Sequence, residues 1–166
     1  MSSYALELVV TDEGAPFYPK VGTVEKLSDS NAGYDLKVVK DLPPTTVPTL
    51  VPLGVRARLM KEVRSYSEDA ICYEEVSCHF SLEPRSSIYK TGFMMVNSRG
   101  IIDRSYTGEL KAPVVTVSSA PTTVPAGTRL FQVIAPDMGH IREVRFVGSL
   151  PETDRGEGGF GSTGTK

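Results

Sequence analysis

The sequence is poor in cysteine and carries little net charge, and both shortages narrow the possible functions. Its two cysteines, Cys72 and Cys78, cannot build the disulfide framework of a small secreted domain. The formal net charge of -2 argues against a general binder of nucleic acid or of membrane surfaces. We therefore expect no nucleic-acid partner, and an anionic ligand would have to be bound by local Arg and Lys side chains.

Long hydrophobic runs are also missing. The longest uncharged stretch, residues 112–128, is broken by prolines and rich in Thr and Ser, so it does not predict a membrane span. The first residues include an acid, Glu7, where a secretory signal peptide would have basic residues. We expect no membrane partner and a reducing intracellular compartment, with cytoplasm and nucleus both left open.

The sequence has no sustained helical periodicity. Short apolar segments rich in β-branched residues alternate with turn residues, and twelve prolines are scattered among them. This pattern predicts one all-β domain over residues 1–150, in the form of a sandwich, barrel or jelly roll. The charged segment 60–70 could hold a helical turn. The expected strands are residues 6–10, 21–27, 51–59, 71–80, 93–96, 109–117, 129–135 and 142–147.

The segment from Asn97 to Gly108 predicts a hairpin that carries functional groups. The apolar residues 93–96 lead into it and residues 109–117 lead out. Asp103 could simply cap the turn, as many aspartates beside turns do. Alternatively the segment forms a slot with main-chain donors and acceptors at its rim, a base in Asp103 and a flat wall in Tyr106. These residues alone leave both interpretations open.

The last sixteen residues, 151–166, contain five glycines and one large apolar side chain, Phe160. Such a composition is typical of a flexible terminus. Closely spaced backbone amides and hydroxyls, preceded by Arg155, would also suit a polyphosphate ligand.

Five sequence blocks in a fixed order connect these features. They are Ala-Gly-Tyr-Asp-Leu at 32–36, Pro-Arg-Ser-Ser at 84–87, the hairpin at 97–108, Gly-Thr-Arg-Leu-Phe-Gln at 127–132, and the glycine-rich residues 155–164. Together they resemble the homotrimeric dUTPase family. The resemblance implies a jelly-roll (β-clip) homotrimer with shared active sites, whose flexible arm, residues 151–166, closes over the substrate.

The same resemblance implies a reaction and its cofactor. A dUTP diphosphatase hydrolyses dUTP to dUMP and pyrophosphate, which removes dUTP and supplies dUMP for dTMP synthesis. Asp103 would be the catalytic base that activates the attacking water. Mg²⁺ would bridge the phosphate oxygens, and Asp35 would support it through water rather than by direct ligation.

The resemblance also implies the substrate-binding residues. The main chain at Gly100, Ile101, Ile102 and Lys111, helped by Asn97, would read uracil, and Tyr106 would exclude the ribose 2′-hydroxyl. The phosphate chain would be bound by side chains from three blocks, and the arm would add a stacking aromatic. These further residues are Arg85, Ser86, Ser87, Gln132, Arg155, Phe160, Gly161, Ser162 and Thr163.

Two features depart from the family pattern. The fourth block reads Gly-Thr-Arg-Leu-Phe-Gln where relatives commonly have Gly-Asp-Arg-Ile-Ala-Gln, so the packing around Phe131 is in question. Residues 60–82 are longer than expected and predict an inserted or extended hairpin. This hairpin carries Cys72, Cys78 and His79, whose spacing matches no zinc site.

Two other functions are open on the sequence alone. A dCTP deaminase, or a bifunctional relative, needs a second acid against the pyrimidine ring, and none stands beside the third block. A catalytically silent relative would act through protein contacts, but the retained Asp103, Tyr106, Arg155 and Phe160 favour catalysis. A partner-binding role for residues 60–82 in addition to catalysis stays possible.

Overall fold

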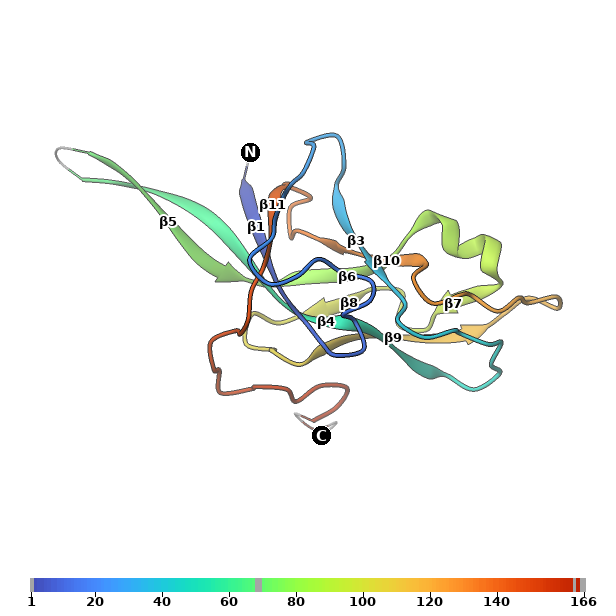
Figure 1. The fold of residues 1–166 in the computed structure, drawn as a ribbon. Helices are drawn as coiled ribbons and strands as arrows, with labels where there is room; N and C mark the ends of the chain where they lie inside the picture. Colours follow the sequence, from blue (N-terminus) through green and yellow to red (C-terminus); the bar gives the residue numbers. More distant parts are fainter. Residues whose placement is uncertain (1, 68–69, 163, 165–166) are drawn as a thin grey trace.

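The computed structural model describes residues 2–67, 70–162 and 164, and almost all of its regular structure is β (Figure 1). A single six-residue 3-10 helix, η1 (Ser86–Thr91), is found in these residues. No helix in the described ranges is long and apolar enough to cross a membrane. The strands are β1 (Ser3–Val10), β2 (Val24–Lys26), β3 (Gly33–Lys37), β4 (Thr49–Tyr66), β5 (Ile71–Cys78), β6 (Phe80–Pro84), β7 (Phe93–Met95), β8 (Gly100–Ile102), β9 (Glu109–Thr116), β10 (Arg129–Ile134) and β11 (His140–Phe146).

The strands form two sheets around one core. The larger sheet has the order β2-β11-β1-β4-β9-β7, with β5 paired to β4, and the smaller has the order β3-β10-β6-β8. Fully buried side chains from both sheets, among them Leu6, Leu53, Leu110 and Phe131, belong to the same hydrophobic cluster. The sequence-predicted all-β fold is confirmed, and two packed sheets agree with the jelly-roll class.

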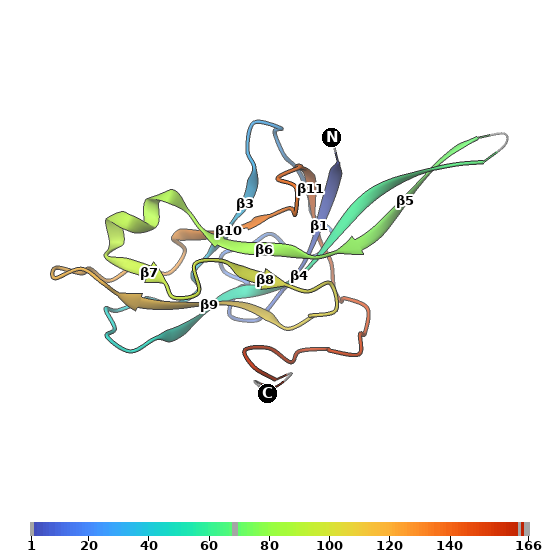
Figure 2. The ribbon, with the colours of Figure 1, turned by 180° about the vertical axis from the view of Figure 1, so that it is seen from behind.

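The hairpin predicted around residues 97–108 is present and also connects the two sheets. β7 and β9 pair antiparallel, with Phe93 opposite Thr116 and Met95 opposite Val114. Between them, β8 leaves this sheet and pairs with β6 of the other sheet. In Figure 2, β8 lies between β6 and the β4–β9 layer. The functional groups of the segment are therefore held where the two sheets meet.

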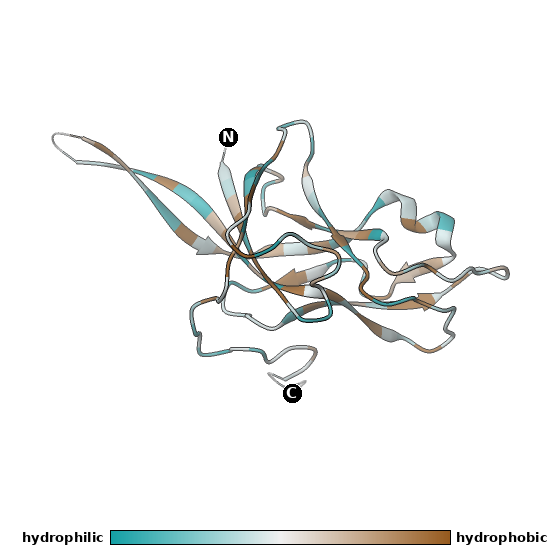
Figure 3. Ribbon diagram, in the orientation of Figure 1, coloured by the Kyte–Doolittle hydropathy of each residue, from teal (hydrophilic) through white to brown (hydrophobic). Residues whose placement is uncertain are grey.

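A long hairpin made by β4 and β5 projects from the body (Figures 1 and 2). The described part of residues 60–70 does not form the helical turn allowed by its charge, because β4 continues to Tyr66, which pairs with Ile71 of β5. Hydrophilic and hydrophobic bands alternate along the projecting part (Figure 3). The expected range 60–82 also includes Phe80 and Leu82, which are buried core residues of β6. The exposed part of the hairpin therefore ends before β6.

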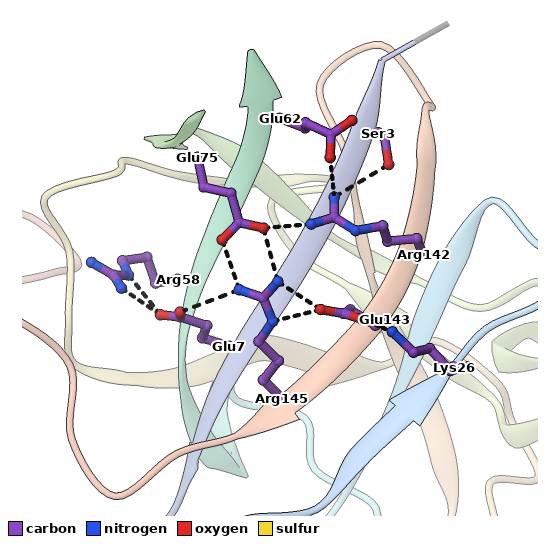
Figure 4. Close-up of polar contacts among 9 residues, drawn as sticks. All are labelled: Ser3, Glu7, Lys26, Arg58, Glu62, Glu75, Arg142, Glu143 and Arg145. Atoms are coloured by element: carbon purple, nitrogen blue, oxygen red, sulfur yellow. Dashed lines mark hydrogen bonds and ion pairs between the residues drawn. The ribbon is translucent and has the colours of Figure 1, made fainter. Parts of the chain in front are cut away.

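Charged side chains fix the base of this hairpin to the body (Figure 4). Glu75 of β5 accepts hydrogen bonds from Arg142 and from Arg145 of β11, the latter at 2.7 Å and 2.8 Å. Hydrogen bonds from Arg145 hold the pKa of Glu75 below its ordinary value. Further members of the network are Glu7, Lys26, Arg58, Glu62 and Glu143. The hairpin is thus tied to β1 and β11 on one face.

Candidate active site

The first candidate site is a small cavity, here called the hairpin cavity, at the junction of the two sheets. Its volume of about 150 Å³ is that of a single ring rather than of a whole nucleotide. Leu82 and Leu110 give it an apolar floor from β6 and β9. Its other lining residues are Asn97, Gly100, Ile101, Ile102, Asp103, Tyr106, Lys111, Arg155, Gly159 and Phe160.

Backbone edges from two strands face this cavity. β8 is the last strand of its sheet, and its ladder to β6 uses one edge only. β9 pairs with β7 from Val114 onward, so the same edge of β9 is not used by β7 at Leu110 and Lys111. Strand edges offer alternating N–H donors and C=O acceptors. A planar ring with both donors and acceptors on its rim can be read by such edges.

Tyr106 forms one wall of the cavity, and its ring is fixed by its own chain. The phenol O–H donates to the carbonyl of Glu109 at 2.7 Å. A Cβ added at Gly108 would lie 2.6 Å from the phenol oxygen, so the ring lies directly over a glycine. Burial raises the pKa of Tyr106 above its ordinary value, which keeps the phenol neutral. The wall is rigid and uncharged.

Asp103 follows β8 directly and lies at the rim of the cavity. Its carboxylate is 45% exposed, and it accepts a hydrogen bond from the guanidinium of Arg155. The Nδ1 atom of His79 lies 3.5 Å from its Oδ1. The carboxylate is therefore placed between a ring-sized cavity and solvent, within reach of two basic side chains.

The C-terminal segment lies across the hairpin cavity. The N–H of Thr107 donates to the carbonyl of Gly156 at 2.9 Å, and Tyr106 forms a parallel bridge with the same glycine. Arg155 stacks over the Tyr106 ring, with 5.5 Å between the guanidinium carbon and the ring centroid. Phe160 lines the mouth and is 58% exposed. A glycine-rich chain can approach the aromatic wall this closely because it lacks side chains.

A second candidate site, the arginine cleft, lies on the smaller sheet. Asp35 of β3 is paired with Arg85 at 2.9 Å and with Arg129 at 3.3 Å. Gln132 of β10 donates to the carbonyl of Pro84 at 3.3 Å. Two guanidiniums around one carboxylate leave a net positive cleft that suits an anion. Its lining residues are Leu27, Asn31, Ala32, Gly33, Tyr34, Asp35, Arg85, Ser86, Arg129 and Gln132.

The two sites lie far apart on one chain. β8 and β3 are the opposite edges of the smaller sheet, with β6 and β10 between them. Three strand spacings amount to about 14 Å. Two residues that flank β6 give a second measure of the separation. His79 lies beside Asp103, and Arg85 pairs with Asp35. His79 and Arg85 are six positions apart, or about 20 Å of extended chain. Asp103 and the arginine cleft of the same chain do not face one another.

The structure distributes the sequence-predicted residues between these two places. The hairpin cavity brings together Asn97, Gly100, Ile101, Ile102, Asp103, Tyr106, Lys111, Arg155 and Phe160. The arginine cleft brings together Asp35, Arg85, Ser86 and Gln132. Ser87 belongs to η1 and lines neither, while Gly161 and Ser162 are exposed beyond Phe160. Thr163 lies outside the described residues.

Two residues near the sites were not among those predicted to bind substrate. Arg129 lines the arginine cleft, and its position in the fourth sequence block was the available signal. His79 lies beside Asp103, but no local pattern indicates this, because the contact depends on the pairing of β6 with β8. Within the described residues, no group of three His, Cys, Asp or Glu side chains is placed to hold a metal ion.

Comparisons with known proteins point to one family. The family model described as dUTPase matches residues 21–164. The deoxyuridine 5′-triphosphate nucleotidohydrolase of Finegoldia magna is 33% identical over 150 residues, which cover 88% of this chain and 90% of that relative. The protein of the same name from Treponema pallidum is 31% identical over 152 residues, covering 90% and 95%.

A solved structure supports the fold, and the fold only. The dUTPase of Streptococcus mutans aligns with a TM-score of 0.50 at 22% identity and covers 86% of this chain and 96% of that chain. The match to the family model spans residues 21–164 and so includes all five blocks, and the two relatives cover 88% and 90% of the chain. The chain therefore belongs to the dUTPase family.

Proposed function

We propose that this protein is a dUTP diphosphatase, which hydrolyses dUTP to dUMP and pyrophosphate. The observation that carries the proposal is the hairpin cavity, where Asp103 stands at the rim of a ring-sized pocket with Tyr106 as one wall. The names of the Finegoldia magna and Treponema pallidum relatives support the same substrate.

Uracil is bound by the backbone edges of β8 and β9. Its N3–H needs an acceptor and its two carbonyl oxygens need donors, and strand edges at Gly100–Ile102 and Lys111 supply both. Cytosine presents an exchanged pattern, which would leave buried polar groups unpaired. The Tyr106 wall packs against the deoxyribose and leaves no room for a 2′-hydroxyl.

Asp103 acts as the general base. A water molecule held by its carboxylate attacks the α-phosphorus, the bond from that phosphorus to the bridging oxygen breaks, and pyrophosphate leaves. The proton of the water passes to Asp103. Arg155, which donates to Asp103 in the structure, turns to the phosphate chain when substrate binds, and this frees the carboxylate for the water.

The arginine cleft binds the phosphate chain. Arg85 and Arg129 provide guanidinium groups, and Ser86 and Gln132 provide neutral donors. Asp35 is the carboxylate among the lining residues of the cleft, and it would support Mg²⁺ through water when the ion is bound with the triphosphate. When bound, the ion supplies charge neutralisation for the triphosphate.

The complete site is shared between copies of the chain in a homotrimer. The separation of Asp103 from its own arginine cleft supports this, since one nucleotide must reach both. The outer face of β4, β9 and β7 carries neighbouring apolar residues, Leu50 opposite Pro113 and Met94 opposite Val115. An exposed apolar patch on a strand surface is typical of a subunit interface.

The C-terminal arm, residues 151–166, closes over the bound nucleotide. Phe160 at the cavity mouth is positioned to stack on the uracil ring. The arm joins the body through few backbone hydrogen bonds, Thr107 to Gly156 among them, so it can open and close. Closure excludes water other than the one held by Asp103.

The reaction is tested by pyrophosphate release. Purified protein with Mg²⁺ is expected to hydrolyse dUTP and to leave UTP, dCTP and dTTP largely intact, and chelation by EDTA is expected to slow it. Asp103→Asn keeps the shape but cannot accept the proton, so turnover should fall by roughly 10²–10⁴-fold. Ammonia release from dCTP would instead identify a deaminase. An active Asp103→Asn enzyme would contradict the role of Asp103 as the general base.

The shared site is tested by mixing two inactive variants. Asp103→Asn and Arg85→Ala are refolded together in equal amounts, and the mass of the assembly is measured by light scattering. If each site takes Asp103 from one chain and Arg85 from another, about one quarter of the sites should be intact. Mixed trimers without any regained activity would show that both residues come from the same chain.

A further inference from the structure

His79 makes two polar contacts with the segment that carries the proposed base. Its Nδ1 atom accepts a hydrogen bond from the backbone N–H of Arg104 at 3.1 Å. The same atom lies 3.5 Å from Oδ1 of Asp103. Phe80 pairs with Ile102 in the ladder between β6 and β8, so His79 and Asp103 are adjacent to this pair on neighbouring chain segments. The fold itself therefore sets them side by side.

Packing does not explain the position of this side chain. The His79 side chain is 61% exposed, and it is not part of the hydrophobic cluster. An exposed imidazole adds little to the core. Its hydrogen bond with the Arg104 amide, beside the Asp103 carboxylate, points to a role in the geometry of the base.

We propose that His79 is a positioning residue that orients Asp103 for proton transfer. The inference rests on the proposed role of Asp103 as the general base. In its neutral form, the Nδ1 lone pair accepts the Arg104 N–H and fixes the backbone directly after the carboxylate. The carboxylate oxygens are then left to the water and to Arg155. A supporting hydrogen bond of this kind holds a reacting group in its productive orientation.

Protonation of His79 would reverse this arrangement. Both ring nitrogens of an imidazolium are donors, so Nδ1 could no longer accept from Arg104 and would donate to Asp103 instead. The carboxylate of Asp103 lies beside the ring, and Arg155 is bound to the same carboxylate. An imidazolium on the carboxylate makes it a poorer proton acceptor. The arrangement can therefore be probed by varying the pH from 5 to 8.5.

The test compares two variants across this pH range. In His79→Asn the side-chain oxygen can accept the Arg104 N–H but cannot become charged, whereas His79→Ala removes the acceptor. We measure kcat and KM for dUTP from pH 5 to 8.5 and check folding by thermal unfolding. His79→Asn should keep the activity at pH 8 and lose less activity than the natural protein on the acid side. His79→Ala should lower kcat about tenfold at pH 8 with little change in KM, and this difference should shrink on the acid side, where the natural protein has lost the same acceptor.

The outcome separates this inference from the proposed function. If both His79 variants match the natural protein in kcat and in pH profile while Asp103→Asn is inactive, His79 is an ordinary surface residue. The proposed role of Asp103 as the general base is then unaffected. If Asp103→Asn is active, both proposals fail. An equal loss of activity in both His79 variants, with an unchanged pH profile, would also overturn the role of the amide contact.

Discussion

The position of the Tyr106 ring depends on neighbouring glycines. The ring lies over Gly108, and the arm glycine Gly159 also approaches it, since a Cβ added there would lie 3.2 Å from the ring. Either position could carry a methyl group only if the ring moved. If Tyr106 is the sugar wall that we propose, discrimination against the ribose 2′-hydroxyl depends on these glycines as much as on the tyrosine.

The substitution Gly108→Ala tests this dependence. The new Cβ would clash with the phenol oxygen at 2.6 Å, so the ring must shift and the sugar pocket must widen. We expect kcat/KM for dUTP to fall about tenfold or more and the preference for dUTP over UTP to decrease.

The matched control is Gly148→Ala, because a Cβ there meets nothing within 4 Å. Both variants are compared by pyrophosphate release with each nucleotide. An unchanged ratio of dUTP to UTP hydrolysis in Gly108→Ala would mean that Tyr106 is not the sugar wall.

The sequence was sufficient to predict candidate site residues that share a short stretch. Asp103, Tyr106 and the backbone at Gly100–Ile102 stand within seven positions, so one local pattern indicates them together. His79 is 24 positions before Asp103 and is brought to it by strand pairing alone. Residues that meet only through the register of two strands leave no local signature.

At the scale of elements, the β4–β5 hairpin separates into an anchored base and an exposed end. Glu62 and Glu75 face each other across the two strands at the charged network. Beyond this pair the strands extend away from the body, and Tyr66 and Tyr73 are exposed. We expect the end of the hairpin to be dispensable for catalysis.

A shortened chain tests that expectation. Residues 63–74 are replaced by Asn-Gly, which favours a two-residue turn and keeps Glu62 opposite Glu75. Turnover of dUTP should stay nearly intact, because the network and His79 are retained. A loss of activity in a variant that still unfolds cooperatively would show that the end of the hairpin takes part in the site.

Element prediction succeeded where strands are long and apolar on one face. β1, β4, β9 and β11 were expected near their observed positions, and their buried residues alternate or run continuously. β8 has three residues, too few for any periodicity, and β3 begins at a glycine in what reads as a turn. The outer part of β4 is exposed on both faces, which removes the alternation that identifies a strand.

At the scale of the whole molecule, carboxylates of the network connect stability to pH. Hydrogen bonds hold the pKa of Glu75 and of Glu143 below the ordinary value of 4.5, chiefly from Arg145 and Lys26 respectively. A lowered folded-state pKa stabilises the fold above about pH 4.5, and this contribution is lost as the pH falls through the folded-state value.

Glu75→Gln should therefore destabilise the protein at pH 7, and the loss of stability should be smaller at pH 3. Because Glu75 is partly exposed, the loss at pH 7 should be about 1 kcal/mol or less. That amounts to a shift in Tm of about 2–4 °C for a chain of this length.

Thermal unfolding between pH 7 and pH 3 measures the difference. The control is Glu74→Gln, whose side chain points to the other face of β5. A Tm difference between Glu75→Gln and the natural protein that stays constant down to pH 3 would contradict the role of this carboxylate.

The order of strands in the two sheets was beyond the reach of local patterns. The five blocks indicate a site, but they do not reveal that Asp103 and Asp35 lie at opposite edges of one sheet. This separation follows from long-range pairing, such as β6 between β8 and β10. The sequence predicted shared active sites through family resemblance alone, and the sheet order adds a physical argument that supports this proposal.

The pairing of β1 with β11 has a consequence for how the chain is made. These strands are parallel neighbours, with Ser3 beside His140. During synthesis, the first strand leaves the ribosome long before its partner exists, and until then one of its edges stays unpaired. A sheet closed by its last strand cannot complete its fold while the chain is still growing. We expect a nascent chain stalled before residue 140 to be sensitive to protease, and the released chain to become resistant.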